Sequence, residues 1–580
     1  MKSKVSGSHR VHKGIAGALI FKHEILKQLS SATNLKESFL EPLLETPPEP
    51  HLGDFAFPCF SLAKKYKQPP NDIASSLIPK LKANQLIEEI EQKGPYINFF
   101  INKAKLASLV INEILKKSSG YGKSHNKKQR ILIEYPSPNT NKPLHLGHIR
   151  NILLGSSLNS LLKFQGNNVY QVSLNNDRGI HICKSMLAYN IYGFNQKPDK
   201  KPDHFVGDFY VKFNQAAIQN PDLEQQAQEM LSKWEQKNPA ILALWKKMNS
   251  WALQGFQETY KKFNLSFTKQ YYESKFYDKG KDIILKALKK GLFTKDEKGN
   301  IIASLPELGN KVVLRADSTS VYITQDIYLA YLKNKEFHPD KSIYIVASEQ
   351  DYHFKALFKI LTTLGFKTNN LYHLSYGMVY LPEGKMKSRE GKVIDADDLI
   401  DEVTQLARNV IEEKHPKLSN KELDKRAKII GMAALKFFIL KQDPKRDFTY
   451  NPEESLSFEG ETGPYIQYTY ARIKSILRKA KPIKQPDLSY LSQAIEKQLI
   501  TLLQKYPQIL AEATEKYKIS LLASYLIELS KTFNSFYHEH PVLKAEHKEV
   551  RAARLHLIKA ISIVLSSALA ILGIEALEEM

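Results

Sequence analysis

Two histidines at the start of a helix are the residues of this 580-residue chain with the clearest chemical potential. They lie in His145-Leu146-Gly147-His148. The apolar run Ile131–Tyr135 before them predicts a buried strand, and the proline-rich segment Pro136–Leu144 predicts a loop. Apolar residues then recur at helical spacing. The two imidazoles therefore stand at a strand-to-helix crossover, where parallel α/β sheets bind phosphates.

The spacing of the histidines places both rings on one side of the first helical turn. Gly147 between them has no side chain to displace a flat ring. Two hydrogen-bond donors beside the positive end of a helix dipole stabilise charge that develops on a phosphate. A pair of capping or metal-binding histidines is the alternative, but no third ligand of suitable spacing is nearby in the sequence. The strand–loop–helix setting favours the phosphate site.

The residues around this pair resemble the "HIGH" signature of class I aminoacyl-tRNA synthetases. With Ser137 ahead of Pro138 and Asn139, the segment is most similar to that of arginyl-tRNA synthetases. The resemblance implies an ATP site in which His145 and His148 are catalytic. The ATP-binding residues that it implies in this segment are Pro138, Asn139, Lys142, His145, Gly147 and His148.

A second basic segment, Gly384–Lys392, carries three cations in five positions between glycines. This pattern predicts a mobile loop that closes on phosphates, with a solvated charged turn as the alternative. The segment resembles the class I "KMSKS" loop, although a lysine replaces the first serine and a serine stands at the second lysine. The resemblance implies that Lys385 is catalytic and leaves open whether Lys387 or Arg389 holds pyrophosphate instead. The ATP-binding residues implied here are Met386, Lys387 and Ser388.

Two polar segments lie at further strand-to-helix turns, Tyr322–Asp326 and Ser348–His353. Helix capping is the alternative reading of both. An arginine substrate requires anions that match its planar fork of donors, and Asp326 and Glu134 are of that type. Both segments also resemble those of arginyl-tRNA synthetases. The arginine-binding residues that the resemblance implies are Glu134, Asn139, Tyr322, Asp326 and Gln350.

Residues 14–115 predict a small N-terminal α+β domain that follows a flexible basic tail at 1–13. Its segments 53–56 and 94–99 resemble the N-terminal domain of arginyl-tRNA synthetases, which holds the D-loop corner of tRNA. The resemblance implies tRNA contacts by Tyr96, stacked on a base, and Asn98, bonded to its edge. A buried hairpin aromatic is the alternative for Tyr96.

The rest of the chain predicts a multidomain α/β protein. A Rossmann-type parallel-sheet domain is expected at 116–430, with strands at Asn168–Leu174, Lys311–Arg315 and Lys341–Ala347 and a helical insertion at about 190–270. The all-α region 431–580 resembles the anticodon-binding domain of the same family. Four cations are expected on its electropositive face, with a solvated helix face as the alternative: Lys474, Arg478, Lys479 and Lys481.

Composition indicates a soluble protein with a polyanionic partner. The net charge is +23 and the pI is about 9.4, which favours nucleic acid over a merely basic surface. The two cysteines, Cys59 and Cys183, predict neither a disulfide framework nor a structural zinc, and a cytoplasmic location is expected. No apolar run approaches the length expected of a membrane span.

The resemblance implies an arginine–tRNA ligase that forms arginyl-adenylate from ATP and L-arginine and transfers arginine to tRNA(Arg). We expect a monomer, Mg²⁺ carried by ATP, and activation of arginine only with tRNA bound. Three rival functions remain: another class I synthetase, a small-molecule nucleotidyltransferase, and a non-catalytic RNA-binding protein. Tyr322 with Asp326 disfavours the first, the basic helical C-terminus the second, and the two nucleotide segments the third.

Overall fold

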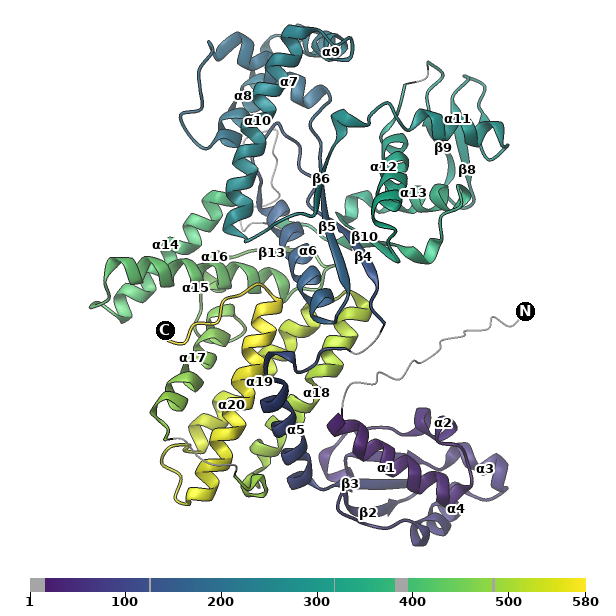
Figure 1. Ribbon diagram of the computed structural model, residues 1–580, viewed down its shortest axis with the longest axis vertical. Helices are drawn as coiled ribbons and strands as arrows, with labels where there is room; N and C mark the ends of the chain where they lie inside the picture. The colour runs from purple at the N-terminus through teal and green to yellow at the C-terminus, as the bar shows by residue number, and fades with distance from the viewer. Residues whose placement is uncertain (1–15, 125–126, 318, 381–394, 482–485) are drawn as a thin grey trace.

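The computed structural model describes residues 16–124, 127–317, 319–380, 395–481 and 486–580. The expected tail at 1–13 lies outside these residues. An N-terminal domain at one end of the molecule is followed by a central α/β domain and a long helical region, and the helical insertion lies at the other end (Figure 1). The multidomain α/β fold class predicted from the sequence is confirmed.

The central sheet has five parallel strands in the order β11-β10-β4-β5-β6. They are β4 (Arg130–Glu134), β5 (Asn168–Asn175), β6 (Lys269–Tyr272), β10 (Lys341–Ala347) and β11 (Leu371–Tyr376). The chain builds outward from β4 to β6 and then returns to the other side of β4. The direction of winding reverses between β4 and β10, and ligands bind at such a reversal outside the carboxyl ends of the strands.

Both faces of β4 are covered, which explains its uninterrupted apolar sequence. Ile131 and Ile133 pack toward α6 (Leu146–Phe164), whereas Leu132 packs with Leu329 of α12 (Tyr322–Phe337). The strand is therefore fixed between two helices. Its last residue, Glu134, lies at the carboxyl end of the strand, where its side chain contacts Lys333 of α12.

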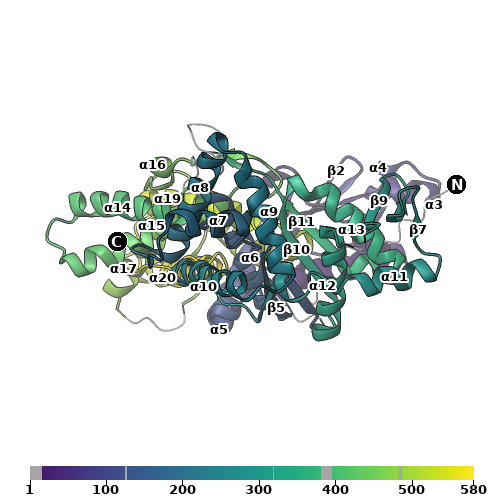
Figure 2. The same ribbon diagram turned by 90° about the horizontal axis from the view of Figure 1, so that it is seen from above.

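Two groups of helices lie on either side of the sheet strands (Figures 1 and 2). The insertion comprises α8 (Pro202–Gln219), α9 (Asp222–Glu235) and α10 (Pro239–Lys262), which pack with α7 (Ile180–Tyr192) around their own apolar core. On the other side lie α11 (Lys281–Lys289), α12 and α13 (Asp351–Thr363).

The strand expected at Lys311–Arg315 does not belong to the central sheet. It is β9 (Gly309–Leu314), the edge of a separate antiparallel sheet with β7 (Thr294–Lys295) and β8 (Ile301–Leu305). Short turns join these three strands, and a short turn permits only antiparallel pairing. Strands β6 and β11, which the sequence analysis did not identify, complete the central sheet instead.

The N-terminal domain is a three-stranded antiparallel sheet covered by helices. Strands β1 (Phe55–Pro58), β2 (Ile87–Lys93) and β3 (Tyr96–Ile101) are ordered β1-β3-β2. The helices are α1 (Ala16–Thr33), α2 (Glu37–Leu40), α3 (Phe60–Tyr66) and α4 (Pro70–Leu77). Helix α5 (Lys103–Lys117), grouped with this domain in the sequence analysis, lies beside the helical region because its apolar residues Val110, Ile111 and Ile114 join the large core there (Figure 1).

The helical region begins before residue 431. Helix α15 (Asn420–Leu440) runs through that position without interruption and pairs with α14 (Ala396–Lys414), so a domain boundary cannot fall at 431. The later helices are α16 (Pro452–Ser455), α17 (Gly463–Lys479), α18 (Ala494–Lys516), α19 (Ser520–Glu539) and α20 (Lys548–Ile571). The short strands β12 (Val379–Tyr380) and β13 (Phe448–Thr449) pair in parallel where this region meets α6.

One helix differs from the expectation that no segment has membrane-spanning length. By length and composition α20 is apolar enough to cross a membrane. Its apolar window is 67% buried inside the protein, where Leu557, Ile561 and Leu565 lie in the large core. A buried core helix satisfies the same criteria as a membrane span.

Candidate active site

The two histidines cap the helix on which they lie. His145 is the N-cap of α6, and its Nδ1 accepts a hydrogen bond from the backbone N–H of Gly147 at 3.1 Å. The backbone N–H of His145 donates in turn to Nδ1 of His148 at 3.1 Å. The ring centroids are 3.9 Å apart. A Cβ atom at Gly147 would lie 3.0 Å from Cε1 of His145, so glycine allows this close approach.

These hydrogen bonds determine which nitrogen carries the proton. Each Nδ1 accepts from a backbone N–H and is therefore unprotonated, which leaves the proton of the neutral ring on Nε2. Burial, together with the charge of nearby Lys142, lowers the pKa of His145 to about 3. Burial, His145 and Lys142 lower the pKa of His148 well below its ordinary value. At neutral pH the site therefore offers two uncharged Nε2–H donors.

The loop before the histidines is held by the loop that follows β5. The backbone N–H of Asn176 donates to the carbonyl of Pro138 at 3.0 Å, and that of Thr140 donates to the carbonyl of Asn176 at 3.2 Å. Ser173 Oγ donates to the carbonyl of Pro136 at 2.9 Å. The predicted ATP-binding loop is thereby fixed at the carboxyl ends of β4 and β5. Asn139 and Lys142 are half-buried within it.

Gln350 lies at the carboxyl end of the neighbouring strand β10, and Asp326 contacts the helix that follows it. Asp326 is one turn after Tyr322 on α12, and the Tyr322 side chain is 76% exposed. Oδ2 of Asp326 is 2.6 Å from Nε2 of His353, in the first turn of α13. Gln350 is exposed at the end of the short 3-10 helix η6 (Ser348–Gln350), which follows β10.

Glu134 has a partner that the sequence analysis missed. Its Oε2 accepts a hydrogen bond from Nζ of Lys333 at 2.6 Å, and both side chains are almost completely buried. Although burial lowers the pKa of Lys333, the charges of Glu134 and Tyr344 raise it further, so the lysine remains protonated. Lys333 lies seven residues after Asp326, on the same face of α12. A lysine that follows the apolar residues Leu329 and Ala330 by about one turn is the sequence signal that could have indicated a buried partner.

The second basic segment, Gly384–Lys392, lies outside the described residues. Lys385, Met386, Lys387 and Ser388 lie outside the described residues, as does Arg389. The first described residue after them, Asp395, forms an antiparallel bridge with His145. The next backbone N–H, that of Ala396, donates to the carbonyl of Leu144 at 2.8 Å. The chain after this segment therefore lies against the histidine turn.

A cluster beside Asp395 has the composition of a metal site. Potential ligand atoms of Asp203, His204 and Asp397 lie within 4.8 Å of one another. However, Nζ of Lys201 is 2.9 Å from Asp203 and 2.7 Å from Asp397, and Lys262 also contacts Asp397 at 3.0 Å. These ammonium groups occupy the position that a cation would take. The cluster is an ion-pair network that joins α8, α10 and the start of α14.

In the N-terminal domain, only one of the two predicted tRNA contacts is accessible. Tyr96 is half-buried, with its ring edge-on to that of Phe60 at 5.6 Å, and Phe60 is itself exposed. Asn98 is only 3% exposed because β3 is the central strand, flanked by Ala56 and Glu91. The expected contact between Asn98 and a base edge therefore has little surface available in this conformation.

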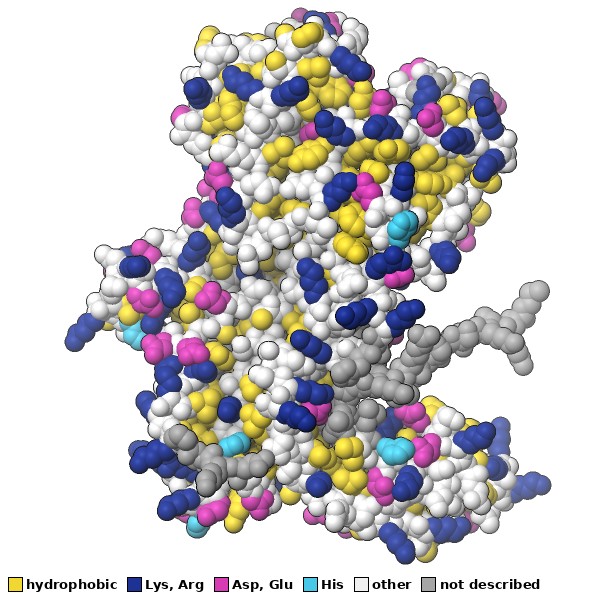
Figure 3. Space-filling view, viewed as in Figure 1, with side chains coloured by type: hydrophobic (Ala, Val, Ile, Leu, Met, Phe, Trp, Pro, Cys, Tyr) yellow, Lys and Arg dark blue, Asp and Glu magenta, His cyan; other side chains and the backbone are white. Residues whose placement is uncertain are grey.

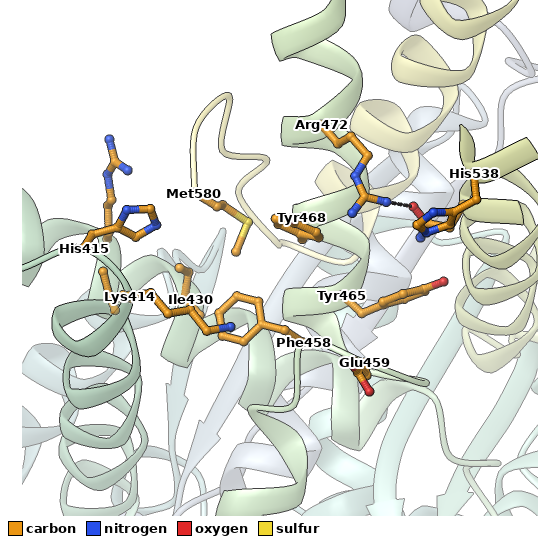
Figure 4. A pocket seen from close by; sticks show the side chains of 13 residues that line it. Lys414, His415, Ile430, Phe458, Glu459, Tyr465, Tyr468, Arg472, His538 and Met580 are labelled. Carbon is orange, nitrogen blue, oxygen red and sulfur yellow. Dashed lines mark hydrogen bonds between the residues drawn. The ribbon is translucent and has the colours of Figure 1, made fainter. Parts of the chain in front are cut away.

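A cavity of about 630 Å³ lies in the helical region. Figure 4 shows Tyr465, Tyr468 and Arg472 projecting from α17 on one side, with His415, the residue that follows α14, opposite and Met580 between them. The guanidinium of Arg472 lies 4.7 Å from the ring centroid of Tyr468. Exposed aromatic rings beside cations are the usual platform for an unpaired base.

The expected electropositive face of α17 is partly neutralised by the end of the chain. Lys474 pairs with Glu578 at 2.8 Å, and Arg478 pairs with Glu579 at 3.1 Å. Because the acids follow α20, no local sequence pattern indicated that they would reach α17. Lys474 and Arg478 therefore form ion pairs with the segment that ends at Met580, a residue that lines the cavity.

Comparison with known proteins identifies all three parts of the chain. Residues 110–451 match the family described as tRNA synthetases class I (R), catalytic domain. Residues 466–580 match the DALR anticodon binding domain, and residues 20–101 match the arginyl tRNA synthetase N terminal domain.

Whole-length relatives agree with these matches. An arginine–tRNA ligase of Treponema denticola is 45% identical over 557 residues, which cover 93% of this chain and 94% of the relative. One of Bacteroides thetaiotaomicron is 42% identical, with 92% and 94% covered. The structure of Thermus thermophilus arginyl-tRNA synthetase superposes with a TM-score of 0.78 at 26% identity, over 97% of this chain and all of that one. The chain therefore belongs to the class I arginyl-tRNA synthetase family.

Proposed function

We propose that this protein is an arginine–tRNA ligase that activates L-arginine with ATP and transfers it to the 3′ end of tRNA(Arg) for protein synthesis. One observation carries the proposal. The histidine turn of α6 and the carboxylate of Asp326 both lie at the carboxyl edge of the sheet, next to the reversal between β4 and β10. A phosphate site and a site for a cationic side chain thus share one edge of the sheet.

In the first step a carboxylate oxygen of arginine attacks the α-phosphorus of ATP. The bond from that phosphorus to the oxygen bridging the β-phosphate breaks, which gives arginyl-adenylate and pyrophosphate. Nε2–H groups of His145 and His148 hydrogen-bond the phosphates as their charge redistributes, and they do so without giving up a proton. Lys385 holds the pyrophosphate, a role that rests on the sequence pattern alone. Mg²⁺ arrives with ATP, and we expect no structural zinc.

Specificity for arginine comes from matching its planar fork of donors. Asp326 accepts the guanidinium with Tyr322 beside it, whereas Asn139, Gln350 and Glu134 line the end that holds the amino-acid head. Lysine lacks the bidentate geometry, so discrimination on the order of 10⁴-fold is attainable without editing. In the second step a terminal ribose hydroxyl of tRNA attacks the adenylate carbonyl, and AMP leaves.

Three features support binding of tRNA along the length of the protein. Tyr96 offers a stacking surface in the N-terminal domain, and the cavity around Tyr468 offers one to an anticodon base. Lys and Arg side chains run down the middle of one face between the central domain and the lower domains (Figure 3). With a net charge of +23, this surface favours a polyanion. We propose that the protein acts as a cytoplasmic monomer without membrane attachment.

Aminoacylation of total tRNA tests the proposed function. The purified protein is incubated with ATP, Mg²⁺ and each of the twenty amino acids in turn, and the charged tRNA is identified by sequencing. We expect arginine on arginine-accepting tRNA alone. Charging with a different amino acid would contradict the assigned specificity.

Replacing His148 tests the role of the imidazole donors. His148→Ala removes one donor and should lower kcat about 100- to 1000-fold, while His148→Gln keeps a donor at similar reach and should lose less. The matched control, His547→Ala at an exposed histidine, should have little effect on kcat. The assay is arginine- and tRNA-dependent ATP–pyrophosphate exchange.

The pH dependence of the same variants tests the charge of the ring. The depressed pKa of His148 keeps it neutral from pH 8 down to pH 5.5, so the ratio of kcat/KM for ATP between wild type and His148→Ala should stay constant over that range. A ratio that changes steeply near the ordinary histidine pKa, about 6.5, would show that protonation of His148 changes kcat/KM for ATP.

Tyr468 tests the cavity of the helical region. Loss of one stacked base costs about 1–3 kcal/mol, so Tyr468→Leu should raise KM for tRNA about 10- to 100-fold and Tyr468→Phe should not. KM for arginine and ATP should stay unchanged in both. Tyr490→Leu, at an exposed tyrosine outside the cavity, is the control. An equal rise of all three KM values would contradict a tRNA-specific role.

A further inference from the structure

The two acids of the arginine site have partners of different chemical type, an ammonium group and an imidazole. Glu134 is bonded to the ammonium of Lys333, whose positive charge compensates that of the carboxylate. Asp326 is bonded to an imidazole, His353, at 2.6 Å. A neutral imidazole donates a hydrogen bond without cancelling the negative charge. Asp326 is therefore the acid that can present a net negative charge to a cationic substrate.

We propose that His353 is a positioning residue for arginine. Its Nε2–H holds one oxygen of Asp326 and thereby sets the distance between the end of the site that takes the guanidinium and the end that takes the amino-acid head. This inference rests on the proposed function. It adds a residue that neither the sequence analysis nor the family signature assigned to the substrate.

The position of His353 in the fold supports this role. It lies three residues after Gln350, in the first turn of α13, whereas Asp326 lies on α12. The bond between their side chains therefore joins the two walls of the site, one with the guanidinium acceptor and the other with a predicted contact to the head. Apart from this bond, the contact between the two helices includes apolar residues such as Ile327 and Phe354.

The turn that carries His353 is itself anchored to the sheet. Asp351, two residues earlier, accepts a hydrogen bond from Ser375 Oγ of β11 at 2.6 Å. Phe354, the next residue, stacks on His373 of the same strand with ring centroids 4.4 Å apart. Asp351 and Phe354, which lie on either side of His353 in this turn, are thus fixed to β11. Because His353 lies in this anchored turn, its hydrogen bond also restrains the position of the Asp326 carboxylate.

The hydrogen bond leaves room for the substrate. An ionised carboxylate accepts at about four lone-pair positions, and His353 occupies one of them on Oδ2. The guanidinium fork needs one position on each oxygen. His353 and arginine can therefore bind Asp326 together, and the imidazole limits the rotation of the carboxylate that would misalign the fork.

Two substitutions separate the donor from the rest of the side chain. His353→Leu removes the donor and keeps the bulk, whereas His353→Gln keeps an N–H at similar reach. Charge-assisted hydrogen bonds contribute about 1.5–3 kcal/mol, so His353→Leu should raise KM for arginine about 10- to 100-fold. KM for ATP and kcat should change less than about 3-fold, and His353→Gln should recover most of the loss. The assay is tRNA-dependent ATP–pyrophosphate exchange, with His547→Leu as the control.

Two further measurements distinguish positioning from a general structural role. In a background of Asp326→Asn, His353→Leu should add little, because the carboxylate that it orients is already altered. Preference for arginine over its homologue one methylene longer should fall in His353→Leu, because the site no longer fixes the distance between its two ends.

The proposal is overturned if His353→Leu leaves KM for arginine unchanged while Asp326→Asn raises it. It is also overturned if His353→Leu and His353→Gln lower kcat and raise both KM values equally, together with a lower unfolding temperature. Absence of exchange by folded wild-type protein with any amino acid would instead refute the proposed function itself.

Discussion

The structure depends on one buried cation, the guanidinium of Arg150. It lies on α6, two residues after His148, and donates hydrogen bonds of 2.5 to 3.3 Å to five backbone carbonyls. Those carbonyls belong to Gly377, Met378, Asp443, Pro444 and Arg446. Burial lowers its pKa to about 10, so the group is still charged at neutral pH. Among the described residues no carboxylate lies within salt-bridge distance of it, and carbonyl dipoles and the ring of Phe448 at 4.8 Å surround it instead.

This arrangement connects the chemistry to the domain architecture. Through Arg150, the helix that carries His145 and His148 is hydrogen-bonded to the chain that leads out of β11 and to the loop that follows α15. The carbonyls of Met378, Asp443 and Pro444 also accept backbone N–H groups, so loss of the guanidinium would chiefly affect those of Gly377 and Arg446, at about 1–3 kcal/mol each. The histidine turn and the junction with the helical region are therefore held by the same side chain. Asp395, bridged to His145, holds the turn from the other side.

Local sequence patterns predicted the elements around the site but not the contacts between them. β4, its loop and α6 were identifiable because an apolar run, three prolines and helical spacing follow one another in the chain. Lys311–Arg315 was misplaced because a short apolar strand looks the same in a parallel and an antiparallel sheet. The role of Asn98 rests on the family resemblance alone, and no local pattern reveals that its strand is the central one of its sheet and that its side chain is buried.

The partners of the site residues were beyond local reasoning. Lys333 lies 199 residues from Glu134, and the carbonyls bound by Arg150 lie 227 to 296 residues away. Such contacts arise from the order of strands in the sheet, which no short window of sequence contains. His353 was visible as part of a polar segment, but its bond to Asp326 depends on how α12 and α13 pack.

We propose that this site activates arginine and no other amino acid. The most direct test is ATP–pyrophosphate exchange with each of the twenty amino acids, measured with and without total tRNA. We expect exchange with arginine alone, and only when tRNA is present. Exchange with another amino acid would contradict the roles given to Asp326 and Tyr322, and absence of exchange under every condition would contradict the assignment of an enzyme.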